Sequence, residues 1–182
     1  MQRKHAHRKD RGFTLVEALI ATVVLSFGVL SLASIFTQGL SASYQTQIQY
    51  IAQQKAQAAM ESIFTARDTR LLTFSQIANV SNGGVFMDGP QPLLAPGPDG
   101  LYGTADDDTT QPDVIVTAPG PDNIFGTADD VKLNLNPWMT RTIVITPSAN
   151  TANLNTITVT ITWNYMGRTN TYVLQSLISN YT

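Results

Sequence analysis

Hydrophobic and polar positions divide the chain into segments of different character. Residues 13–36 are almost all apolar, and apolar side chains then recur three and four positions apart among many glutamines up to about Thr65. A membrane-spanning helix needs about 20 apolar residues, so we assign 13–38 to such a helix. The later spacing predicts an amphipathic continuation over 39–65. We therefore expect one helix from Phe13 to about Thr65, with a packing face made of Tyr44, Ile48, Ile51, Ala52, Ala59 and Ile63.

The second half of the chain has the pattern of a small β-rich head. Residues 66–112 are rich in Gly, Pro, Asn and Ser and lack periodicity, which predicts a connecting loop. Strand patterns follow at residues 114–116, 142–145, 156–165 and 169–178. The third of these alternates strictly, which places Ile157, Val159, Ile161, Trp163 and Tyr165 on one buried face. With Met166-Gly167 as a tight turn, we expect an antiparallel meander over 140–178 in a head spanning 66–182, hence an α+β fold.

Charge is distributed unevenly along this sequence. Charged residues make up 13% of the chain, below the ~25% of a typical soluble domain. Residues 1–12 are strongly basic, and basic residues stay on the cytoplasmic side of a membrane, so we expect the N-terminus inside and the head outside. The rest of the chain is acidic, which disfavours nucleic acid as a partner. The absence of cysteine excludes disulfides and thiolate chemistry.

Glu17 is the one ionisable residue inside the apolar run, and it needs an explanation. A carboxylate at the centre of a membrane helix costs ~2.5–3.5 kcal/mol, so such residues usually have a partner. The residues around it read Arg11-Gly12-Phe13-Thr14-Leu15-Val16-Glu17. A basic leader, a Gly before an aromatic residue and an acid at the fifth position beyond it together resemble the class III signal of type IV prepilins. A snorkelling anchor near the membrane surface is the alternative interpretation of Glu17.

The resemblance covers residues 1 to about 40 and has definite implications. It implies that a prepilin peptidase/N-methylase cleaves between Gly12 and Phe13, removes leader 1–12 and methylates the new amine of Phe13. It also implies that this amine meets Glu17 of a neighbouring subunit in a filament. Signal-peptidase cleavage near Ala33-Ser34 or Ser41-Ala42-Ser43 is the competing possibility. Residues beyond Glu17 look most like those of V-type minor pilins.

The family's architecture and location follow as further expectations. The pilin fold is a lollipop, in which a long helix packs on an antiparallel sheet. The precursor is a single-pass protein of the bacterial inner membrane that later enters a periplasmic or extracellular filament. Its partners are the other pilin subunits and the assembly platform of the inner membrane.

An acidic motif occurs twice in the head. Residues 96–107 (PGPDGLYGTADD) return as 119–130 (PGPDNIFGTADD), identical at nine of twelve positions. Ca²⁺ takes 6–8 oxygen ligands and favours loops with carboxylates, amides and glycine, so we expect calcium ligands among Asp99, Asp106, Asp107, Asp122, Asn123, Asp129 and Asp130. The spacing does not match an EF-hand. The alternative is a pair of Asx-type turns with solvated acids.

Two functional hypotheses of different class remain. The chain beyond residue 12 contains neither His nor Cys and no Gly-x-Ser-x-Gly motif, so we do not expect an enzyme. The first hypothesis is a minor pilin or pseudopilin with calcium-stabilised loops. The second is a membrane-anchored or secreted calcium-binding, adhesive module that does not assemble. Pilus, type II secretion pseudopilus and DNA-uptake system are not distinguished by the sequence.

Overall fold

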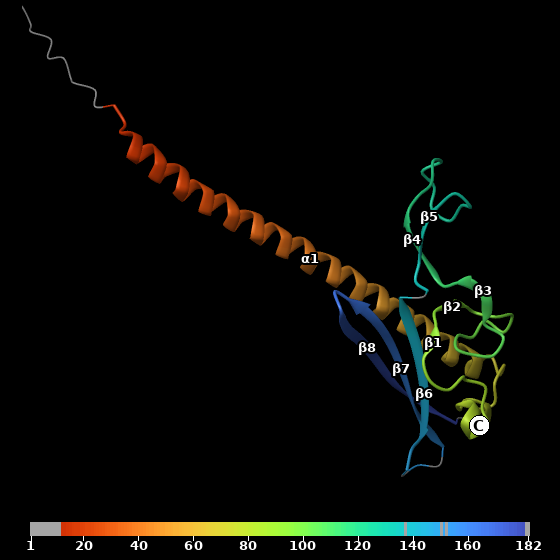
Figure 1. The fold of residues 1–182 in the computed structure, drawn as a ribbon. Coiled ribbons are helices and arrows are strands. Elements are labelled where there is room, and N and C mark those ends of the chain that lie inside the picture. The colour runs from red at the N-terminus through yellow and green to blue at the C-terminus, as the bar shows by residue number, and fades with distance from the viewer. Residues whose placement is uncertain (1–11, 137, 150, 152, 181–182) are drawn as a thin grey trace, which may run out of the picture. The chain divides into compact units, whose positions relative to one another are not determined.

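The computed structural model describes residues 12–136, 138–149, 151 and 153–180. The expected α+β class is confirmed, because one long helix precedes a series of antiparallel strands (Figure 1). The chain divides into two units, Met1–Gln47 and Ile48–Thr182, and the second is called the C-terminal unit below. The elements are α1 (Leu15–Asp68), the 3₁₀ turns η1 (Phe74–Gln76) and η2 (Val80–Asn82), and the strands β1 (Gln91–Pro92), β2 (Leu94–Ala95), β3 (Asp108–Pro112), β4 (Val114–Ala118), β5 (Val131–Asn134), β6 (Met139–Pro147), β7 (Leu154–Tyr165) and β8 (Arg168–Ser179).

Helix α1 is close to the expected helix but ends three residues later. Ala66 is buried, so the apolar face continues for one more turn beyond Ile63. The helix then ends at Asp68, and Arg70 takes a left-handed conformation with φ of 60°. A left-handed residue just past the last turn is a common way for a helix to end.

The main sheet has the strand order β1-β6-β7-β8, and all neighbours are antiparallel. The expected meander is therefore present, with Ile143 opposite Val159 and Val159 opposite Leu174. Met166 and Gly167 join β7 to β8 with φ of 49° and 74°. Positive φ at both positions is the mark of a type I′ hairpin turn, which suits the twist of the paired strands. The alternating face of β7 is buried as expected, except that Tyr165 is only half-buried.

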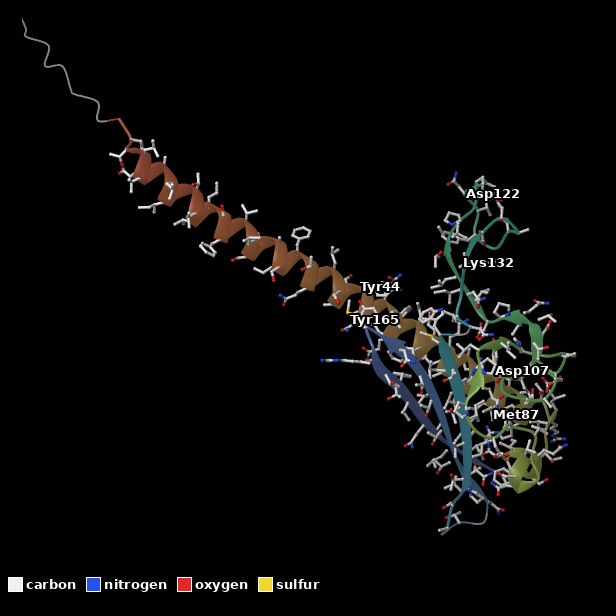
Figure 2. All side chains as sticks on the ribbon, viewed as in Figure 1. Tyr44, Met87, Asp107, Asp122, Lys132 and Tyr165 are labelled. Carbon is white, nitrogen blue, oxygen red and sulfur yellow. The ribbon has the colours of Figure 1, made fainter. Side chains whose placement is uncertain are left out.

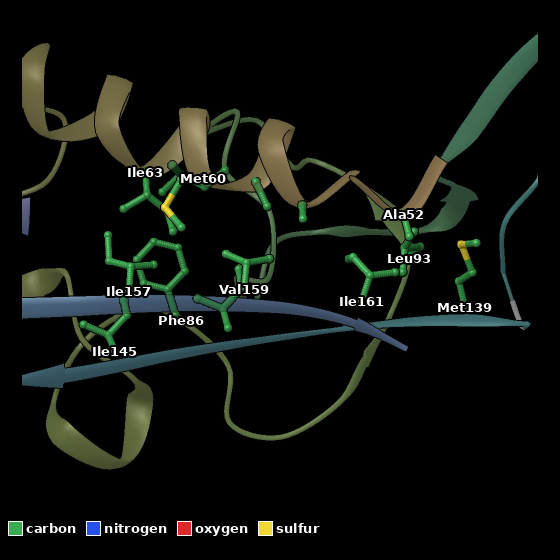
Figure 3. Close-up of a cluster of buried hydrophobic side chains, with 14 of the residues drawn as sticks. Ala52, Met60, Ile63, Phe86, Leu93, Met139, Ile145, Ile157, Val159 and Ile161 are labelled. Atoms are coloured by element: carbon green, nitrogen blue, oxygen red, sulfur yellow. The ribbon is translucent and has the colours of Figure 1, made fainter. Parts of the chain in front are cut away.

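The core of the C-terminal unit lies between the last five turns of α1 and one face of this sheet. Figure 3 shows Met60 and Ile63 of the helix directed at Ile157 and Val159 of the sheet. Ala52, Ala56 and Ala59 are fully buried, and their small side chains let the helix approach the strands closely. Burying one Ile side chain contributes ~1.5–3 kcal/mol, so this face provides much of the stability. Tyr44, expected on the same face, is 51% exposed and is not part of it.

The loop over residues 69–112 contains structure that the sequence pattern did not indicate. Asn79 is buried beside β6, where its Nδ2 donates to the carbonyl of Ile143 and its Oδ1 accepts from the amide of Ile145, both at 2.8 Å. This side chain replaces a strand partner at the edge of the sheet. Strands β3 and β5 form small antiparallel pairs with β2 and β4. Strand β3 is mostly exposed and polar and lacks the alternation that predicts a strand. Strand β5 (Val-Lys-Leu-Asn) does alternate, a signal that our sequence reasoning did not use.

Candidate functional site

Gly12 and Phe13 lie in non-helical backbone immediately before α1. Phe13 is 83% exposed, and a Cβ built on Gly12 would meet no atom within 4 Å. The peptide bond between them is therefore reachable from solvent. A protease needs an accessible, extended segment, and glycine offers the least obstruction to it.

Thr14 and Glu17 form a reciprocal pair at the first turn of α1. The Thr14 amide donates to Glu17 Oε2 at 3.3 Å, and the Glu17 amide donates to Thr14 Oγ1 at 3.3 Å. The Thr14 hydroxyl adds a third hydrogen bond to Glu17 Oε2 at 3.2 Å. Together these contacts are a capping box, which satisfies amides that have no partner inside the helix. The spacing Thr-x-x-Glu was visible in the sequence, but our reasoning assigned Glu17 only to membrane and assembly roles.

The following segment of α1, from Leu15 to Gln47, has almost no buried side chains among the described residues. Phe27, Leu30, Ile35 and Phe36 are each more than 60% exposed. By length and composition α1 is suited to crossing a membrane. Among the described residues it is the one helix that meets this criterion. An apolar helical surface of this size is stable only in lipid or against other apolar helices.

Residues 7–33 match the family described as "Prokaryotic N-terminal methylation motif". The chain's N-terminal segment therefore carries the signal of type IV pilin-like proteins. The motif is that of a structural pilin or pseudopilin precursor, and with the apolar helix it fits anchoring in the inner membrane. No curated protein and no solved structure matched this sequence.

This match confirms the resemblance drawn from the residues around Glu17, while some details of this pilin-like protein stay predictions. The V-type assignment, the cleavage between Gly12 and Phe13 and the role of Glu17 in assembly are among them. Residues 1–11 of the expected leader lie outside the described residues.

The two acidic repeats of the pilin-like chain have the same local structure. In the first copy Asp99 Oδ1 accepts from the Leu101 amide at 2.8 Å, and in the second Asp122 Oδ1 accepts from the Ile124 amide at 2.9 Å. Two further hydrogen bonds also recur. In the first copy the Gly103 amide donates to Asp107 Oδ2 and the Thr104 hydroxyl donates to Asp106 Oδ1. In the second copy the Gly126 amide donates to Asp130 Oδ2 and the Thr127 hydroxyl donates to Asp129 Oδ1. Each copy is thus an Asx turn followed by a second acid-capped turn.

Backbone geometry reinforces the likeness between the two copies. A Cβ on Gly97 would lie 2.3 Å from the carbonyl oxygen of Asp106, and one on Gly120 would lie 2.3 Å from Asp129 Oδ2. In both loops the glycine therefore packs against the aspartate nine positions later in the chain, and a residue with a side chain would not fit at the glycine position. Gly100 of the first copy has φ of 73°, and its counterpart Asn123 has φ of 57°. Asn tolerates this left-handed conformation better than most residues, so the replacement preserves the turn.

The structure distributes the expected calcium ligands along two separate loops. Figure 2 shows Asp122 at the tip of the β4–β5 hairpin and Asp107 in the other loop. Among the described residues no three side chains of His, Cys, Asp or Glu gather as a metal site would require. Most of the carboxylates cap turns instead, but Asp130 is 8% exposed and its Oδ1 has no hydrogen-bond partner. Burial raises the pKa of Asp107, against the hydrogen bonds from Gly103 and Thr104 that lower it.

A buried group of charges joins α1 to the first repeat and to the sheet. Lys55 Nζ lies 2.5 Å from Asp113 Oδ1, and Arg141 Nη2 lies 3.5 Å from Asp113 Oδ2. The Arg141 guanidinium also lies over the Tyr102 ring, 4.4 Å from its centroid. Burial lowers the pKa of Arg141, while Asp113, Asp107 and Tyr102 oppose this. Period-two alternation from Ile143 and Ile145 places Arg141 on the inner face, a signal that our sequence reasoning did not use.

Proposed function

We propose that this protein is a structural subunit, a minor pilin or pseudopilin, of a type IV pilus or a type II secretion-like filament. Residues 13–38 would form the assembly helix. The observation that carries this proposal is an exposed apolar helix that begins at Leu15, two residues after an accessible Gly12-Phe13 bond. An inner-membrane precursor needs such a helix as an anchor, and a filament needs it as a core.

The role proposed for Glu17 is charge pairing with the methylated amine of Phe13 in a neighbouring subunit. In the single chain, Glu17 already bonds Thr14, and its side chain is exposed. A carboxylate has room for about four hydrogen bonds, so this cap leaves acceptor positions for a cation. An attraction of order 4 kcal/mol at 4 Å with an effective dielectric constant near 20 opposes the desolvation of both groups. Its main effect would be to fix the register between subunits.

The direct test is recovery of the protein in sheared filaments. In cells that also express a prepilin peptidase and the assembly platform, we expect the processed chain in the sheared fraction, at a low ratio to a major subunit. Unprocessed protein, or a Gly12→Ile variant that resists cleavage, should stay in the inner membrane. Processed protein found only in the membrane would favour the second hypothesis, an anchored module that does not assemble.

Calcium binding is a second proposal, favoured by one observation. Asp130 is buried with an unpaired Oδ1 at the end of a loop that also contains Asp122 and Asp129. An ionised carboxylate oxygen without a partner is costly in a buried position, and a cation would offset that cost. The ligands would come from one repeat at a time, completed by backbone carbonyls and water. Cell adhesion would then depend on the stabilised head.

A further inference from the structure

The two repeats fold alike, but their hydrophobic pairs have opposite surroundings. In the first copy Leu101 is 2% exposed within the core, and Tyr102 stacks against the guanidinium of Arg141. The equivalent residues of the second copy, Ile124 and Phe125, are 60% and 65% exposed. In the first copy, the loop therefore inserts its aliphatic–aromatic pair beside an arginine.

The second copy stands at the tip of the hairpin formed by β4 and β5 (Figure 2). All four residues of β5 are exposed, and Val116 and Val131 add apolar surface at 42% and 54% exposure. A two-stranded hairpin by itself is at best marginally stable in water. An apolar patch on such an element marks a surface that another molecule covers.

The first copy and the charges of the tip together define the surface that would cover it. The cover needs an apolar hollow with an arginine beside it, since an aromatic ring attracts a guanidinium placed over its face. The tip also carries the exposed acids Asp122 and Asp129, so a cationic border is favoured.

The C-terminal unit of this chain itself contains such a hollow. A cavity of about 270 Å³ has apolar walls at Leu72 and Phe74, polar ones at Thr73, Ser179 and Asn180, and the arginines Arg67 and Arg70 at its border. This volume lies just below the ~300–1,000 Å³ of small-molecule pockets and suits an inserted side chain. Arg67 pairs with Asp68, but Arg70 is exposed and has no ion-pair partner among the described residues. A neighbouring hollow of about 270 Å³ is bordered by Asp99, which would repel the acids of the tip.

We propose that Phe125 of one subunit inserts into the hollow beside Arg70 of a second copy of this chain. Leu72 and Phe74 form its walls, and Asp122 and Asp129 face the arginines. The inserting and receiving surfaces differ, so the contact is heterologous and repeats along an open array instead of closing a symmetric dimer. This contact between C-terminal units is independent of the N-terminal helix, and it adds to the proposed filament a second interface.

Cysteine cross-linking of the full-length protein tests the contact directly. The chain has no cysteine, so Ile124→Cys at the tip and Ser179→Cys in the lining of the hollow introduce the only thiols. In concentrated detergent solution, without any assembly machinery, mild oxidation should give a ladder of dimers, trimers and larger species. Either single variant should stay monomeric. Ile124→Cys combined with Val144→Cys, an exposed position on the sheet, should give no ladder.

Two further variants of the double-cysteine protein identify the residues that form the contact. Phe125→Ala and Arg70→Glu should each remove the bands above monomer. Arg168→Glu makes the same charge change at an exposed position at the opposite end of β8 from Ser179 and should leave the ladder intact. Phe125 and Arg70 are exposed, so we expect both variants to fold. Thermal melts that match those of the double-cysteine protein will check this.

Three results would overturn the proposal. They are a dimer from Ile124→Cys alone, which indicates tip-to-tip pairing; no ladder from the double variant; or a ladder that Arg70→Glu does not reduce. Recovery in sheared filaments is scored separately in cells. A protein that forms the ladder but never enters filaments would disprove the proposed function and leave this contact standing.

Discussion

Thr14 and Glu17 bond each other's backbone and side chain at the first turn of α1. The acid of the pilin-like signal therefore has an intramolecular role as a helix cap in addition to any role between subunits. A capping residue contributes ~0.5–2 kcal/mol to a helix, and an acid near the N-terminus also favours the helix dipole. Loss of assembly in a Glu17 variant alone would not distinguish the two roles.

Substitutions at these two positions separate helix capping from charge pairing. Glu17→Gln keeps the capping box but removes the charge, whereas Thr14→Ala removes the hydroxyl of the cap and keeps the charge. If the charge aligns subunits, Glu17→Gln and Glu17→Ala should both reduce filament incorporation about 10-fold or more, and Thr14→Ala much less. The measurement is the ratio of sheared to membrane-bound protein, with processing checked by mass. Normal incorporation of Glu17→Gln would assign Glu17 to the cap.

Processing at the Gly12-Phe13 bond gives a second prediction. Intact mass and N-terminal sequencing of membrane-extracted protein should show a chain that begins at methylated Phe13. Gly12→Ile should block cleavage, because a branched side chain obstructs the scissile backbone, and Gly28→Ile within the helix serves as the control that is cleaved normally. A chain that begins near Ser43 would instead indicate signal peptidase.

The buried charges at Asp113 give a third prediction. Asp113→Ala leaves the buried Arg141 and the part-buried Lys55 without their carboxylate, and we expect a loss of ~3–5 kcal/mol in the free energy of unfolding. Arg141→Met leaves the Lys55–Asp113 pair intact and replaces the other cation with an apolar side chain, so its cost should be smaller. Urea unfolding followed by tryptophan fluorescence, to which the 7%-exposed Trp163 contributes, measures both. Equal costs would show that the pairing at Asp113 is unimportant.

Calcium binding is tested by a fourth set of measurements. Millimolar calcium should raise the melting temperature of the full-length protein, since a ligand at 100 times its Kd stabilises by ~2.7 kcal/mol. Asp99→Asn with Asp122→Asn retains an oxygen for each Asx turn but removes two charges, so this variant should lose the gain and melt normally in chelator. An unchanged melt in calcium, with no heat of binding, would leave the loops as acid-capped turns.

The pH dependence of stability gives a fifth prediction, in which two acids act with opposite sign. Burial raises the pKa of Asp107, so the native state holds its proton more tightly and stability falls as pH rises above 3.8 through the native pKa. A hydrogen bond from Thr127 lowers the pKa of Asp129, so its contribution is present at pH 3.8 and above and is lost as pH falls. The free energy of unfolding, measured between pH 3 and 7, should therefore fall less above pH 3.8 in Asp107→Asn. In Asp129→Asn it should fall less as the pH drops below 3.8.

Local patterns in the sequence determined much of this protein. The apolar run after Phe13, the alternation in β7 and the Met166-Gly167 turn predicted the helix, the buried face and the meander, because each follows from short-range periodicity or turn chemistry. The duplicated acidic motif was equally clear. These features depend on neighbours within a few residues, so they can be recognised without knowing which distant segments meet.

Only the tertiary structure decided which surroundings each segment received. Asn79 beside Ile143 and Lys55 beside Asp113 are contacts between residues 64 and 58 positions apart, and short-range periodicity does not specify such pairs. The two repeats show the same limit most directly. Nearly identical sequences fold into the same local turns, but Leu101 is buried while Ile124 is exposed. Burial depends on what the rest of the chain places against a loop, and that is a property of the whole fold.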